Sequence, residues 1–226
     1  MPKTASETLF ERFCESHGIP YLHIPKEQGP TPDYEIAVGT ERIIVEVKEI
    51  TPNKEEQESD RLLAERGYGE VLSRTPGDRV RKKISDCSPQ IKARTAGKHP
   101  SFLVLFDRGR VAGHLNPYNI RVAMHGLERV HISVPPIGMG SPYPTGMSYG
   151  PKRKMTPEDN TSISAIGALF MTGPESVFLN VYHNRYAQVP LNTTLLAPYR
   201  VAQFELEEDV PSRTSKWRAI ALSLEP

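Results

Sequence analysis

Residues 32–50 read PDYEIAVGTERIIVEVKEI, and this stretch predicts two strands joined by a tight turn. The first strand is expected over Asp33–Val38 and the second over Arg42–Ile50. Because side chains alternate along a strand, Glu46 and Lys48 point to the same face of the second strand. The apolar residues between and before them point the other way, into a core. A strand that buries one face therefore places a carboxylate and an ammonium side by side on the other.

These residue types suit metal-assisted hydrolysis of a phosphodiester. If Asp33 ends the neighbouring strand, its carboxylate approaches that of Glu46, and the two would suit Mg²⁺ or Mn²⁺. Lys48 would then orient or activate a water molecule and stabilise the charge that develops on a phosphate. The alternative is that Asp33 only caps a turn, while Glu46 and Lys48 form an exposed pair on a half-solvated strand.

The residues before this stretch predict a helix and one more strand. Thr4 followed by Glu7 forms the pattern of a capping box, and Gly18 is placed as a C-terminal cap, so a helix is expected over residues 5–17. The apolar segment 19–24 is expected to form a strand. The opening order is therefore helix, strand, strand, strand.

Charge is strongly segregated along the chain. Residues 1–70 hold 8 Lys and Arg against 15 Asp and Glu, whereas residues 71–100 hold 8 against 2. The basic segment is predicted to form a helix over 79–95, capped by Asp78 and kinked or split at Pro89. An acidic segment beside a basic one is consistent with a metal site next to a phosphate-binding face, and also with two solvated helix faces.

The length of 226 residues favours one α/β domain. We expect a core over about 4–134, a Pro- and Gly-rich loop over 135–157 and a strand-rich extension over 158–226. A helix is further expected over 116–125, and the highly charged segment 54–73 is compatible with a mobile helix without fixing its structure. Further strands are expected at 101–106, 129–134, 162–171, 176–182, 199–206 and 216–222, the last four closing the sheet.

At Pro32-Asp33 and Glu46-x-Lys48 the sequence resembles the PD-(D/E)xK nuclease superfamily. The resemblance covers residues 4–106 and implies a restriction-endonuclease-like fold, a mixed central sheet flanked by helices. It implies a DNA endonuclease in which Asp33, Glu46 and Lys48 are catalytic and Mg²⁺ or Mn²⁺ is the cofactor. Many members carry a further metal-site Glu about eleven residues before the glycine that ends the first helix; here that residue is Glu7, with Glu11 as the fallback.

The resemblance also bears on the basic helix, where members often carry a Lys, an Arg or a Gln. Lys83 and Gln90 are the candidates for that position. If the helix contacts DNA, the contacting residues are expected to be Arg79, Arg81, Lys82, Lys83, Gln90, Lys92 and Arg94. Members are often dimers, so a homodimer is one expectation.

No apolar run approaches the ~18 residues of a membrane-spanning helix, so no membrane partner is expected. The acidic start and the presence of only Cys14 and Cys87 favour a reducing cytoplasm. The leading hypothesis is a cytoplasmic metal-dependent DNA endonuclease. The alternatives are a catalytically inactive nucleic-acid or protein-binding module on the same fold, and a nuclease acting on RNA or branched DNA.

Overall fold

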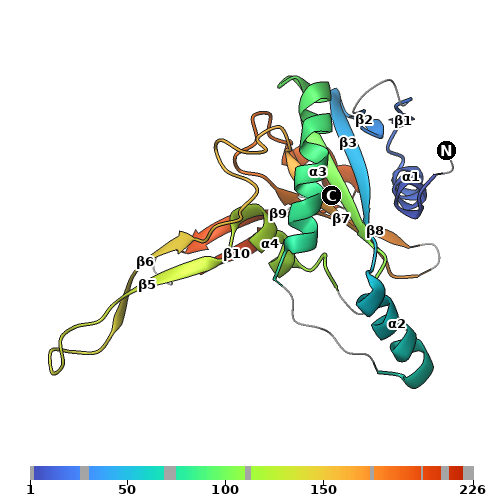
Figure 1. The fold of residues 1–226 in the computed structure, drawn as a ribbon. Coiled ribbons are helices and arrows are strands. Elements are labelled where there is room, and N and C mark those ends of the chain that lie inside the picture. The colour runs from blue at the N-terminus through green and yellow to red at the C-terminus, as the bar shows by residue number, and fades with distance from the viewer. Residues whose placement is uncertain are drawn as a thin grey trace.

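A mixed sheet of eight strands, in the order β1-β2-β3-β4-β7-β8-β9-β10, forms the centre of the molecule (Figure 1). The computed structural model describes residues 3–25, 31–68, 75–109, 113–173, 176–199, 201–209 and 214–220. In chain order the elements are α1 (Ala5–His17), β1 (Tyr21–His23), β2 (Tyr34–Val38), β3 (Glu41–Ile50), α2 (Lys54–Arg66), α3 (Asp78–Thr95), β4 (Ser101–Asp107), α4 (Pro117–His125), β5 (Glu128–Ser133), β6 (Tyr143–Tyr149), β7 (Ala165–Met171), β8 (Val177–His183), the 3-10 helix η1 (Thr193–Tyr199), β9 (Ala202–Asp209) and β10 (Thr214–Ala219). The predicted α/β class, a mixed sheet flanked by helices, is confirmed.

The middle of the sheet is parallel and its two margins are largely antiparallel. Strands β3, β4 and β7 run parallel to one another, and β1, β2 and β3 form an antiparallel meander. Strand β4 lies between β3 and β7, and its first five residues are buried. This position explains its uninterrupted apolar sequence, because a central parallel strand is covered on both faces. The predicted C-terminal strands complete the sheet as β7 to β10; residues 221 and 222 of the last predicted strand lie outside the described residues.

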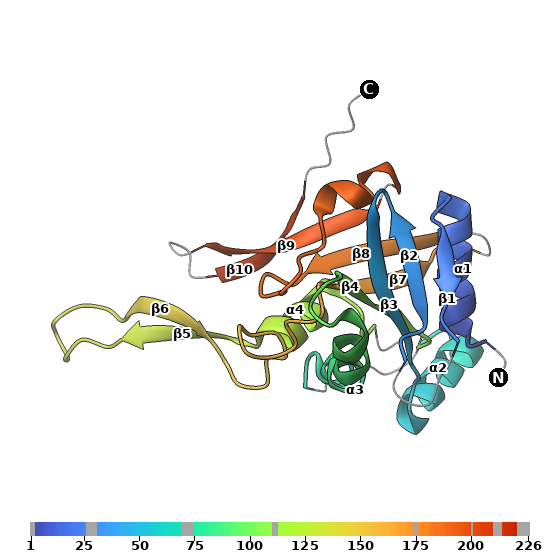
Figure 2. The ribbon, with the colours of Figure 1, turned by 90° about the horizontal axis from the view of Figure 1, so that it is seen from above.

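Helices cover both faces of the sheet and form two separate cores (Figures 1 and 2). On one face α1 packs through Phe10 against residues that include Val45. On the other face α3 and α4 pack through Ile84 and Ile120 against residues that include Leu103. Strand β3 contributes to both cores, so its two faces have different neighbours.

Helix α1 has the predicted boundaries of residues 5–17. The Thr4 hydroxyl accepts a hydrogen bond from the Glu7 amide at 3.2 Å, and the Glu7 carboxylate accepts one from the Thr4 amide at 2.6 Å. Gly18 ends the helix in the left-handed conformation at φ +65°. Both ends are therefore determined by contacts within a few residues.

Helix α3 differs from the prediction at its start and at Pro89. Its N-cap is Gly77, and Asp78 is the first helical residue, where its carboxylate pairs with Arg81. The expected split is wrong, because α3 is continuous through Pro89. Pro89 lies on the exposed side of the helix, where water can reach the carbonyl that has no amide partner.

Helix α2 begins at the predicted residue, Lys54, and ends at Arg66. Residues 69–73, which the prediction included in this helix, lie outside the described residues. None of the helices in the described part of the chain combines the length and the hydropathy that a bilayer crossing requires.

Strands β5 and β6 leave the main sheet and form a separate two-stranded ribbon, which extends far from the body (Figures 1 and 2). The expectation of a loop over residues 135–157 is therefore wrong for Tyr143–Tyr149, which form β6. Pro144 and Gly146 lie inside β6, and the strand was not predicted because both residue types are unfavourable within strands. The pairing survives because Pro144 lies next to a bulge, where the register shifts between His131 and Ile132.

Substitutions at two glycines with nearly equal φ angles can test how closely α3 and α4 pack. Gly77 has φ +75° and Gly67, after α2, has φ +76°. A Cβ at Gly77 would lie 2.7 Å from the Asn119 carbonyl oxygen, whereas a Cβ at Gly67 meets nothing within 4 Å. Both Gly→Ala changes should cost about 1–2 kcal/mol for the left-handed backbone. Gly77→Ala should cost about 1–3 kcal/mol more through steric overlap. Equal losses of thermal stability in Gly77→Ala and Gly67→Ala would contradict the close contact between Gly77 and α4.

Candidate active site

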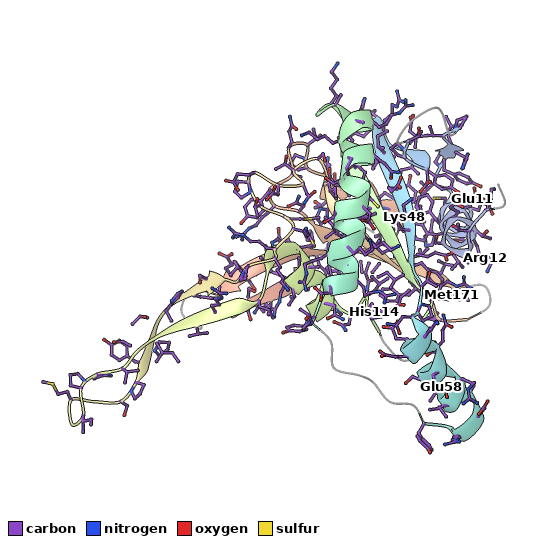
Figure 3. All side chains as sticks on the ribbon, in the orientation of Figure 1. Glu11, Arg12, Lys48, Glu58, His114 and Met171 are labelled. Carbon is purple, nitrogen blue, oxygen red and sulfur yellow. The ribbon has the colours of Figure 1, made fainter. Side chains whose placement is uncertain are left out.

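Strand β3 presents Glu46 and Lys48 on the face covered by α3, as the alternation in the sequence predicted. The strand's apolar residues Val45 and Val47 enter the core on the α1 side. Glu46 has no exposed surface, whereas the Lys48 side chain keeps 31% of its surface exposed. In Figure 3, Lys48 lies on β3 beside α3. The glutamate is thus at the bottom of the site and the lysine at its open side.

Asp33 directly precedes β2 and completes a group of three charged side chains. The β2–β3 ladder pairs Tyr34 with Val45, so Asp33 comes next along β2, on the Glu46 side of that pair. Its Oδ2 accepts a hydrogen bond from the Val47 amide at 3.0 Å and lies 3.4 Å from Lys48 Nζ. Lys48 Nζ also forms an ion pair with Glu46 Oε1. The ammonium of Lys48 therefore contacts both carboxylates.

The surroundings of Glu46 disfavour its charged form. Burial, and secondly the charge of Asp33, raise the pKa of Glu46 to about 7, although Lys48 acts in the opposite direction. Burial lowers the pKa of Lys48, but the two carboxylates outweigh burial and the net direction is upward. Apart from the ion pair with Lys48, neither buried oxygen of Glu46 has a hydrogen bond of standard geometry among the residues that the structure describes. Buried carboxylate oxygens without such partners are costly, and a small hard cation would satisfy them.

Helix α3 contributes Cys87, whose thiol interacts electrostatically with Glu46 and Lys48. Lys83 and Gln90 lie four residues before and three residues after Cys87, so they share its face of the helix. The Cys87 thiol is fully buried, and burial together with the charge of Glu46 raises its pKa to about 12. Within the described segments, the buried side-chain oxygen of Gln90 has no hydrogen-bond partner. The sequence analysis did not include Cys87 among the site residues, and its helical spacing to Lys83 and Gln90 was the pattern that could have placed it here.

Glu7 does not join Asp33 and Glu46. Its carboxylate accepts hydrogen bonds from the Thr4 amide and hydroxyl, and α1 packs on the face of the sheet opposite to Glu46. The fallback, Glu11, accepts a hydrogen bond from the Tyr34 hydroxyl at 2.9 Å. Within the described ranges, no group of three or more His, Cys, Asp or Glu side chains is arranged to hold a metal ion. The carboxylates that lie together beside Lys48 are those of Asp33 and Glu46.

The residues of α3 that were predicted to contact nucleic acid are not all exposed on one surface. Arg81 is buried and donates to the carbonyl oxygens of Pro76 and Val122, so it ties α3 to α4 and is removed from that surface. Arg79 pairs with Glu56 and also donates to a backbone carbonyl. The residues of α3 with exposed cationic side chains are Lys82, Lys92 and Arg94.

A second charged cluster, which the sequence analysis missed, lies where the parallel strands β3 and β4 end. Glu56 at the start of α2 lies 3.0 Å from His114 Nε2 and 3.5 Å from Arg79. Asp107, at the end of β4, accepts a hydrogen bond from the His114 amide at 2.7 Å. Figure 3 places His114 near the first turn of α3. Only the position of Asp107 at a strand end could have indicated this cluster.

The chain was compared with models of known protein families, with curated proteins and with solved structures, and none of them matches it. The residues and their geometry are therefore the basis for the function proposed below.

Substituting the two carboxylates in metal-free buffer should change the free energy of unfolding in opposite directions. Asp33→Ala leaves the buried Val47 amide unpaired and should cost about 1–3 kcal/mol of unfolding free energy. Glu46→Gln removes a buried charge and should be neutral or stabilising at pH 8. The folded pKa of Glu46 lies above its unfolded value of 4.5, so the wild type should lose stability relative to Glu46→Gln as pH rises from 4.5 to about 7. Chemical denaturation at several pH values in the presence of chelator measures both effects. A Glu46→Gln variant less stable than the wild type at pH 8 would contradict the claim that the buried charge of Glu46 destabilises the fold.

Proposed function

We propose that the protein is a metal-dependent nuclease that hydrolyses phosphodiester bonds in DNA, with a restriction-endonuclease-like site. The observation that carries the proposal is Glu46, a buried carboxylate without well-directed hydrogen bonds, lying beside Asp33 and Lys48. Burying such a carboxylate is costly even beside a lysine, and a well-packed apolar residue in its place would often be as stable or more stable. Perturbed carboxylates beside a lysine are typical of functional sites.

The arrangement of the elements supports the restriction-endonuclease-like fold. Helix α1 precedes the meander of β1, β2 and β3, and α3 then leads to β4, which pairs in parallel with β3. The resemblance to the PD-(D/E)xK superfamily implies a helix, a three-stranded meander, a helix and another strand, and this chain adds α2 between β3 and α3. The motif residues occupy neighbouring positions on β3 and directly before β2, as that resemblance requires.

Asp33 and Glu46 are the residues that would hold Mg²⁺ or Mn²⁺, which would supply positive charge against the phosphate and lower the pKa of a bound water. Lys48 cannot be a ligand, since an ammonium has three donors and no acceptor. Two of its donors face Asp33 and Glu46, which leaves the third for the exposed side of the site. From there Lys48 would orient the attacking water or donate to a phosphate oxygen.

A catalytically inactive binding module is the second candidate, and one observation favours it. Glu7, the further carboxylate that the resemblance implies, is engaged in the cap of α1 on the opposite face of the sheet. With two carboxylates in place of three, the site would bind a cation more weakly. Measurement of cation binding therefore separates the two candidates.

The first test of function compares metal binding with cleavage. Mn²⁺ should raise the thermal stability of the wild type, by about 2.7 kcal/mol at a hundredfold excess over Kd. Asp33→Asn and Glu46→Gln should lose both this stabilisation and the cleavage of plasmid and single-stranded DNA. Lys48→Gln should retain the stabilisation by Mn²⁺ but lose about 10²-fold or more in single-turnover rate.

Glu35→Gln is the matched control, because Glu35 lies on β2 close to Asp33 but pairs with Arg42 at the surface. The Glu35→Gln variant should keep both the stabilisation by Mn²⁺ and the cleavage of DNA. A wild type that binds no Mn²⁺ and cleaves neither DNA would favour the inactive module, and a Lys48→Gln variant that loses metal binding would show that the lysine holds the site together.

DNA binding is proposed to use the exposed cations of α3. Replacing Lys82, Lys92 and Arg94 by Gln should weaken binding and reduce the slope of log K against log salt by up to about 0.9 for each phosphate that these cations neutralise. The control replaces Lys54, Lys216 and Arg218, which removes the same charge from the exposed surfaces of α2 and β10. Equal slopes for the two triple variants would show that the α3 cations are only solvated.

A further inference from the structure

The β5–β6 ribbon, residues 128–149, is an arm that extends away from both cores (Figures 1 and 2). In the described part of the chain no other strand pairs with β5 or β6. A two-stranded ribbon is at best marginally stable in water on its own, so an arm of this kind needs either support at its base or a partner.

The base of the arm is firmly attached to the body. Glu128 accepts a hydrogen bond from the Ser215 amide at 2.6 Å, and the Tyr149 hydroxyl donates to Glu208 at 3.0 Å. The Gly150 amide also donates to the Leu127 carbonyl at 2.6 Å. These contacts determine the direction of the arm, so that a partner would meet a surface that is already oriented.

One face of the arm is apolar and uncovered. Val130 lies opposite Met147, and Ile132 lies opposite Pro144, so these four side chains share one face of the ribbon. Val130 is 50% exposed and Ile132 is 60% exposed. At the tip, the side chains of Val134, Ile137 and Met139 are exposed as well. Several exposed apolar side chains on one short segment are typical of an interaction site.

The charge of the arm indicates what covers this face. From residue 132 to residue 151 the sequence contains no Asp, Glu, Lys, Arg or His. Binding to nucleic acid depends on cations that neutralise phosphates, and this part of the arm supplies none. A second copy of the arm is apolar and uncharged in the same way, so that pairing the two faces would bury no charge without a partner.

A two-fold axis brings the same surface of two copies into contact, so one self-complementary apolar face is sufficient for an interface. We propose that the chain forms a two-fold dimer in which the apolar face of the arm packs on the same face of a second copy's arm. In Figure 3 the arm points away from Lys48, so this dimer leaves the candidate active site open.

The oligomeric state, measured by sedimentation equilibrium without metal or DNA, tests the proposal independently of nuclease activity. The wild type should dimerise, and the double change Val130→Thr and Ile132→Thr should weaken dimerisation by about tenfold or more. The matched control, His131→Thr and Ser133→Thr, changes the opposite face of the same strand and should dimerise like the wild type. Threonine is β-branched and favours a strand, so both variants place residues of the same strand-forming type in β5.

Cross-linking provides a second readout if the apolar-face variant fails to fold. Cys14 and Cys87 are fully buried, so a cysteine introduced by Ile132→Cys is the reactive thiol on this face, and two copies should join through it on mild oxidation. A wild type that stays monomeric at its highest soluble concentration would overturn the proposal. An apolar-face variant that keeps the oligomeric state of the wild type but loses DNA affinity would also overturn it, and would assign the arm to nucleic acid.

Discussion

The hydrogen bond from the Val47 amide to Asp33 Oδ2 joins the sheet to the candidate site. The β2–β3 ladder ends at the pair of Tyr34 and Val45, so the aspartate carboxylate accepts the amide that the neighbouring backbone no longer pairs. This contact holds Asp33 beside Lys48 and Glu46. It also depends on the register of β3, because a slip of one residue would move Glu46 to the α1 side and Val47 to the α3 side. The same alternation that separates the two cores therefore builds the site.

The ion pairs of the site only partly offset the cost of burying Glu46, so the surroundings must hold the site in place. Glu46 is buried next to Asp33, and its contact with Lys48 does not provide it with well-directed hydrogen bonds. Strand β3 can hold such a group because its neighbours along the strand are buried in two cores, with Val45 on one side and Ile50 on the other. The dense packing of these cores offsets the cost of an unfavourable carboxylate.

Features determined by local contacts could be predicted from the sequence, and features determined by the packing of distant segments could not. The ends of α1 follow from Thr4, Glu7 and Gly18, which interact within a few residues of one another. That Glu46 and Lys48 share a face follows from strand geometry alone. The exclusion of Glu7 from the site depends on which face of the sheet α1 covers, and the burial of Arg81 depends on the position of α4. Strand β6 was missed because its Pro144 and Gly146 are residues that normally interrupt strands.

The contacts of Glu56 have a consequence for the dynamics of the molecule. This one carboxylate accepts the Asn53 amide at 2.7 Å as part of the cap of α2, contacts His114 in the segment before α4 and pairs with Arg79 in the first turn of α3. Three segments that are distant in sequence therefore share one anchor. Local opening that breaks the anchor should release them together, as one cooperative unit in amide hydrogen exchange. The strands of the two cores would retain their protection during that opening, so the molecule should loosen first at the end of the parallel strands β3 and β4.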